Sequence, residues 1–155
     1  MNKVPVSTFQ ELSILHKALL LGQLLFIGIV FGLIYAKLLV PVMASQDKFL
    51  QVIVVVISGA LLFISGKFFK KKIQGIKNSN YTNNEKAAKY KSACIMQWVL
   101  VEIISLIAGM AFFLTGNFSF LALAGFVVIL MILYSPTVFK MAVHTQLTEQ
   151  EIKEV

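Results

Sequence analysis

Glu102 is the only ionisable side chain that lies well inside a long apolar segment of this sequence. An ionised carboxylate at the centre of a lipid bilayer costs at least about 2.5 to 3.5 kcal/mol unless it is paired or protonated. Such a residue therefore needs a physical cause. A carboxyl that gains and loses a proton would serve proton-coupled transport, whereas a permanently protonated one would donate a structural hydrogen bond.

Helical spacing groups other residues with Glu102. Trp98 precedes it by four residues, and Ser105 and Gly109 follow it by three and seven, so all four share one face of a helix. This face predicts that the carboxyl points into the interior of a helix bundle, where burial favours the protonated form. Gln23 of the first span could accept a hydrogen bond from this carboxyl, whereas Gln97 lies at a different angle on its helix and could bond elsewhere. The predicted proton or substrate site comprises Glu102, Trp98, Ser105, Gln97 and Gln23.

The residues that most active sites require are scarce. The sequence has two His and one Cys, and it contains no His-Glu-x-x-His metal motif, no glycine-rich phosphate loop and no Gly-x-Ser-x-Gly elbow. His16 and His144 lie near the ends of apolar segments, where contact with interfacial water is expected rather than metal ligation. We therefore predict that the protein is not an enzyme and has no catalytic residue, metal or cofactor.

The elements that carry these residues are set by an extreme composition. Of 155 residues, 58% are hydrophobic and 14% are charged, a balance that a water-soluble domain of this size could not bury. The apolar residues form four blocks, each long enough to cross a bilayer. These blocks predict a single transmembrane domain over residues 1–155, with an all-α integral membrane four-helix bundle whose spans are about 18–39, 49–69, 93–114 and 118–139.

Turn and cap signals refine these spans. The gap at 115–117 is so short that the last two spans must be antiparallel neighbours, which predicts two transmembrane hairpins. Thr8 with Glu11 matches a capping box, and Asn84 is a plausible cap for the helix leading into the third span. Pro136 should kink or end the fourth span, and a second capping pattern predicts a short, frayed cytoplasmic helix at about 149–155.

The lysines predict the orientation. The sequence has a net charge of +7 and no Arg, which argues against nucleic acid as a partner. Eight Lys lie at residues 67–91, and because Lys near span ends is retained inside the cell, the basic loop at about 70–91 and both termini should be cytoplasmic. We expect a multi-pass protein of a bacterial inner (plasma) membrane. Besides setting topology, Lys70, Lys71 and Lys72 are candidates for binding anionic lipids.

Small residues mark where helices could pack closely, either within the bundle or between protomers. They recur at helical spacing in all four spans, and the predicted packing residues are Gly28, Gly32, Ala36, Ser58, Gly59, Ser65, Gly66, Gly109 and Gly125.

Together these features favour a non-enzymatic accessory or interaction subunit, with membrane lipids and a homo-oligomer or larger membrane complex as its partners. The alternative is a small proton-coupled transporter or channel that uses Glu102.

Overall fold

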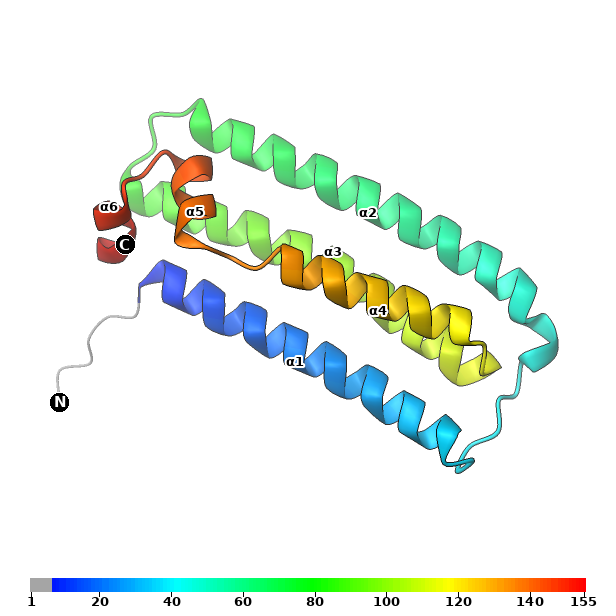
Figure 1. The fold of residues 1–155 in the computed structure, drawn as a ribbon. Coiled ribbons are helices and arrows are strands. Elements are labelled where there is room, and N and C mark those ends of the chain that lie inside the picture. The colour runs from blue at the N-terminus through cyan, green and yellow to red at the C-terminus, as the bar shows by residue number, and fades with distance from the viewer. Residues whose placement is uncertain (1–6) are drawn as a thin grey trace, which may run out of the picture.

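The computed structural model describes residues 7–155, and every regular element within that range is a helix, which confirms the all-α prediction (Figure 1). Residues 1–6 of the predicted domain lie outside the described residues. Three helices are long and apolar enough to span a membrane. A bent pair of helices makes a fourth span if it is counted as one. The three long helices are α1 (Thr8–Tyr35), α2 (Asp47–Lys77) and α3 (Asn83–Thr115), and the bent pair is α4 (Phe118–Leu133) with α5 (Val138–Thr145).

The helix boundaries correct the predicted basic loop. α2 continues to Lys77 and α3 begins at Asn83, so most of the segment 70–91 is helical and the turn between the two helices is short. With 31 residues, α2 is about 46 Å long, whereas the hydrocarbon core of a bilayer is about 30 Å thick. The lysines therefore lie on two helix ends that continue past the apolar stretches of α2 and α3. The polar composition of this segment predicts a loop. Lys is nevertheless a good helix former outside lipid, so both helices continue through the segment.

Two of the predicted helix ends move by a few residues. α1 ends at Tyr35 rather than near Leu39. The cap of α3 is Thr82 and not Asn84, because Thr82 and Glu85 form a reciprocal capping box in which the Thr82 amide donates to a Glu85 carboxylate oxygen at 2.9 Å.

α3 is the central helix of the fold. Half of the residues in its most apolar window are buried, against 11% for α1 and 17% for α2. It packs against α1, α2 and α4, and Figure 1 shows α1 and α2 on opposite sides of the α3–α4 pair. The arrangement is therefore not a symmetric bundle, since α1 and α2 share no extensive contact. Most of the surfaces of α1 and α2 are left for lipid or for another chain.

The end of the molecule opposite the turn between α2 and α3 is held by short connections. A 3-10 helix, η1 (Ala44–Gln46), leads into α2, and the Met43 amide donates to the carbonyl of Leu114 at 2.9 Å. Gly116 ends α3 with a φ of 68°, and an added Cβ there would also lie 2.8 Å from Cγ of Pro41. Only glycine fits both demands readily. The tight turn at Gly116 and Asn117 makes α3 and α4 antiparallel neighbours, as predicted.

At the other end, the two termini of the described chain meet (Figure 1). Ser7, rather than Thr8, caps α1, and the Thr8 hydroxyl instead donates to the carbonyl of Val155 at 2.6 Å. The predicted C-terminal helix is present as α6 (Glu149–Glu154), and Thr148 and Glu151 form its capping box. The backbone and side-chain hydrogen bonds that Thr148 donates hold the pKa of Glu151 below its usual value. The helix is docked rather than frayed, because Ile152 is buried.

The last apolar segment is a helix pair that breaks next to Pro136, as predicted. α4 ends at Leu133, α5 begins at Val138, and the two axes differ by 71°. Proline has no amide hydrogen and cannot continue the helical ladder, so carbonyl groups at the end of α4 lose their usual donors.

Side chains from three other helices donate to carbonyls at this break. The Trp98 indole of α3 donates to the Tyr134 carbonyl at 3.2 Å, and the Lys140 ammonium of α5 donates to the carbonyls of Leu133 and Ser135 at 2.8 and 2.9 Å. A ring nitrogen of His16 on α1 hydrogen-bonds to the Met131 carbonyl at 2.9 Å. His16 is therefore buried against α4. The prediction that its side chain contacts interfacial water is wrong.

Replacing Trp98 by Phe should destabilise the protein. The change keeps an aromatic ring but removes the donor to the partly buried Tyr134 carbonyl, and a hydrogen bond of this kind contributes about 0.5 to 1.5 kcal/mol. We expect a lower melting temperature in neutral detergent by differential scanning calorimetry. Tyr134→Phe is the matched control, because it alters the side chain and leaves that carbonyl bonded. Equal melting temperatures for Trp98→Phe and the wild type would contradict this account.

Candidate functional site

Glu102 lies near the middle of α3 at the edge of the packed interior. It is half-buried, whereas Trp98, Ser105 and Gly109 on the same predicted face are all buried. Val99 and Leu106, about one turn before and after it, are 39% and 40% exposed. The carboxyl thus sits between the buried and the exposed stripes of α3. No hydrogen bond or ion pair to it is formed by the residues that the structure describes.

Gln23 of α1 and Ser105 of α3 are the buried polar groups of this region. They are 1% and 0% exposed, and both side-chain amide atoms of Gln23 and the hydroxyl of Ser105 lack a hydrogen-bond partner within residues 7–155. Buried polar atoms are normally satisfied by protein or by ordered water. These three buried polar atoms therefore form a site where a bound water molecule or ion would be stabilised.

The register between α1 and α3 puts these two residues at one level. The rings of His16 and Trp98 meet edge to face at 4.7 Å, and an added Cβ at Gly109 would lie 2.5 Å from Cε1 of Phe26. Both pairs have nearly the same separation in sequence, as expected for parallel helices in contact. Counting between them places Gln23 beside Ser105, about one turn from Glu102.

Gln97 does not belong to this group. It is buried toward α2, where its main-chain carbonyl accepts from the Ser65 hydroxyl at 3.5 Å. Trp98 is engaged with the carbonyl of Tyr134 and packs on His16, so it positions α4. The structure thus divides the predicted site into Gln23 and Ser105 inside, Glu102 at the edge, and two residues with separate contacts.

The predicted packing residues divide in the same way. Ser58 and Ser65 are buried, and Gly109 lets the ring of Phe26 approach α3. The others do not pack within the described chain. A Cβ added at any of the other glycines would meet nothing within 4 Å, and Ala36 is exposed; these glycines are Gly28, Gly32, Gly59, Gly66 and Gly125.

Other chemistry finds little support in the described residues. Within residues 7–155, no three His, Cys, Asp or Glu side chains come together in a way that could hold a metal ion. Cys94 is buried as a free thiol. Lys71 and Lys72 line a cavity between α2 and α3, which Lys70 does not reach.

Sequence reasoning missed two groups. His16 and Lys140 form hydrogen bonds to carbonyls at the break between α4 and α5. Pro136 was the only sequence signal for them, because a proline in an apolar segment predicts carbonyls that need other donors. Lys89 and Tyr81 line the cavity together with Lys71 and Lys72. The sequence did not predict this cavity, because it forms between two helix ends where a loop is expected.

Comparison with known proteins adds no family. No protein-family model matches the chain, and no curated protein and no solved structure shows significant similarity to it.

Gln23→Met should leave the stability in detergent unchanged or raise it. The substitution keeps the volume and removes two unpaired polar atoms, and no formed protein hydrogen bond is lost. Thermal unfolding measures the effect. His16→Phe is the positive control, because it removes a formed bond and should lower the melting temperature. A marked loss of stability in Gln23→Met would show instead that the amide binds internal water or an ion.

Proposed function

We propose that this chain is a non-enzymatic, multi-pass subunit that assembles with other transmembrane helices in a bacterial plasma membrane. The carrying observation is Glu102, a carboxyl at mid-span that the described chain leaves half-exposed and without a partner. An acid facing lipid is unfavourable by several kcal/mol, about 2.5 to 3.5 on insertion scales. A donor from a neighbouring chain would remove that penalty, so the residue favours assembly.

The outer faces of the helices support the same proposal. Gly28 and Gly32 are four residues apart on the exposed side of α1, and nothing lies near either. Helices in lipid associate through close backbone approach at such residues. Large exposed side chains flank them, including Leu25 at 57% and Ile29 at 61%. This face is compatible with a second copy or with another membrane subunit.

Charge supports a cytoplasmic location for the end that holds both termini. The ends of α2 and α3 that meet there carry the dense group of lysines, whereas the opposite end carries Lys37 and Lys48 with Asp47. Retention of Lys on the inner side of a plasma membrane would then place the termini and the turn 78–82 inside the cell.

Proton-coupled transport is the second candidate, and the unpaired Gln23 and Ser105 favour it. Polar atoms that are buried without partners beside an acidic residue are suited to hold water or a passing ion. In that case Glu102 would load and release a proton during each cycle.

Replacing Glu102 separates the two functions. For a subunit, Glu102→Leu should weaken the association of the oligomer or stoichiometric complex in mild detergent by about five- to thirtyfold, as expected for loss of an interhelical hydrogen bond worth about 1 to 2 kcal/mol. Light scattering after size-exclusion chromatography measures the particle. Ile129→Ala, which changes an exposed apolar side chain on α4, is the control and should leave assembly intact.

The opposite pattern would overturn the subunit proposal. It consists of unchanged assembly in Glu102→Leu together with a proton-driven flux in reconstituted vesicles that Glu102→Gln abolishes. Glu102→Gln keeps the size and a hydrogen-bonding group but cannot carry a proton, so it should retain assembly at least in part and lose any transport.

A further inference from the structure

A cavity of about 520 Å³ lies between the ends of α2 and α3, next to the turn that joins them. Lysines from both helices line it together with a tyrosine, a serine and a phenylalanine: Lys71, Lys72, Lys89, Tyr81, Ser92 and Phe68. Its size suits the polar head of a lipid. Gly75 leaves room in its wall, because a Cβ there would meet nothing within 4 Å.

The cavity is strongly cationic. None of its three lysines forms an ion pair within the described residues. Glu85 is about one turn from Lys89, but one of its carboxylate oxygens accepts from both the amide and the hydroxyl of Thr82. The Lys72 ammonium lies 5.4 Å from the ring centre of Phe68, and that of Lys89 lies 4.5 Å from that of Tyr81. These cation–π contacts hold two of the charges at the cavity.

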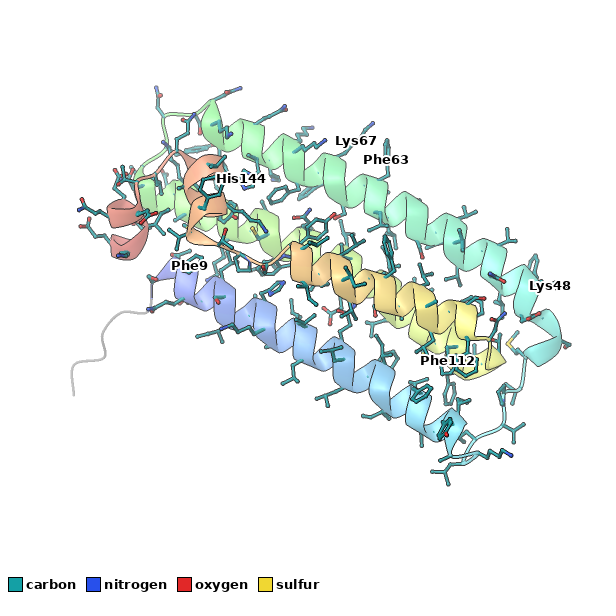
Figure 2. The ribbon with its side chains drawn as sticks, in the orientation of Figure 1. Phe9, Lys48, Phe63, Lys67, Phe112 and His144 are labelled. Atoms are coloured by element: carbon teal, nitrogen blue, oxygen red, sulfur yellow. The ribbon has the colours of Figure 1, made fainter. Side chains whose placement is uncertain are left out.

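The cavity lies at the depth of lipid headgroups. On α2, residues 49–66 carry no charge, and the helix rises about 28 Å from Lys48 to Lys67, close to the thickness of the hydrocarbon core. Figure 2 shows Lys48 near one end of α2 and Lys67 well along the helix, projecting outward beside Phe63. The cavity begins one residue beyond Lys67, at Phe68. Tyr81 fits this level, since tyrosine is enriched at membrane interfaces.

Exposed apolar side chains follow on both helices toward mid-span. Among them are Ile64 of α2 and Met96 and Ile103 of α3, which are 52%, 45% and 37% exposed. Farther along, the same two helices form a second, almost wholly apolar groove of about 400 Å³, whose lining includes Ile57 and Leu106. A cationic head site followed by an apolar surface on one helix pair matches an anionic lipid better than a free anion.

We propose that this cavity binds the phosphate of an anionic phospholipid, whose acyl chains lie along α2 and α3. Lys71, Lys72 and Lys89 neutralise the phosphate, and the hydroxyls of Tyr81 and Ser92 are placed to hydrogen-bond to it. The headgroup cavity does not include Glu102. The proposed site also differs from simple attraction of lysines to a charged surface, because it requires an open cavity.

The test uses the purified full-length chain in neutral detergent and follows its melting temperature. Dioctanoyl phosphatidylglycerol should raise that temperature saturably, because a ligand that binds the folded state stabilises it. Dioctanoyl phosphatidylcholine, which has the same chains but a cationic group on its phosphate, should have little effect. Inorganic phosphate at the same concentrations should also have little effect.

Two variants separate a built site from diffuse charge. Lys71→Gln/Lys72→Gln/Lys89→Gln should weaken the apparent affinity for phosphatidylglycerol at least about tenfold, given the contribution of each lysine near a membrane surface. Gly75→Leu should do the same by filling the cavity without changing any charge. The matched control, Lys67→Gln/Lys70→Gln/Lys77→Gln, removes three lysines outside the cavity and should change the affinity less than about twofold.

Several results would overturn the proposal. An equal shift with inorganic phosphate would assign the cavity to a free anion, and an equal shift with phosphatidylcholine would mean that the chains alone bind. Equal weakening by the control triple variant, or wild-type affinity in Gly75→Leu, would reduce the effect to surface charge. Because Gly75→Leu tests the cavity alone, the proposal stays testable even if the triple variant fails to fold.

Discussion

The hydrocarbon core of a bilayer offers no hydrogen bonds, so each polar group of a spanning backbone must be satisfied by the protein. Continuous helices meet this constraint in α1, α2 and α3. The fourth span cannot, because Pro136 interrupts its ladder. Carbonyls at the break accept hydrogen bonds from Trp98 of α3, His16 of α1 and Lys140 of α5. This cluster ties three helices to the break and so determines how α1, α3 and α4 meet.

With α3 at the centre, the interior is small and the outer surface is large. α1 and α2 each place one stripe against α3 and leave the rest of their surface exposed. The features that suggest interaction all lie at the margins of this core: Glu102 at the edge of α3, the exposed glycines of α1, and the basic cavity where α2 and α3 leave the membrane. Each is a surface on which lipid or another chain could complete the structure.

Hydropathy was sufficient to find the helices but not their ends or their facing directions. The polar composition of residues 70–91 predicts a loop, yet a helix can continue into water, and α2 reaches Lys77 while α3 begins at Asn83. Glu102 shared a face with Trp98 and Ser105, but a spacing of three or four residues spreads that face over a wide arc, and Glu102 fell at its edge. The hydrogen-bond partner of His16 is the carbonyl of Met131, which lies 115 residues away in the sequence. No local sequence pattern could predict that contact.

The central claim is that these helices cross a membrane with the lysine-rich end inside the cell. It can be tested with single cysteines in a Cys94→Ala background, using an impermeant maleimide on intact and permeabilised cells. Val42→Cys, in the exposed connection between α1 and α2, should be labelled in intact cells. Asn80→Cys, in the turn between α2 and α3, should be labelled only after permeabilisation. Labelling of both from the same side, or of Asn80→Cys alone in intact cells, would contradict the account.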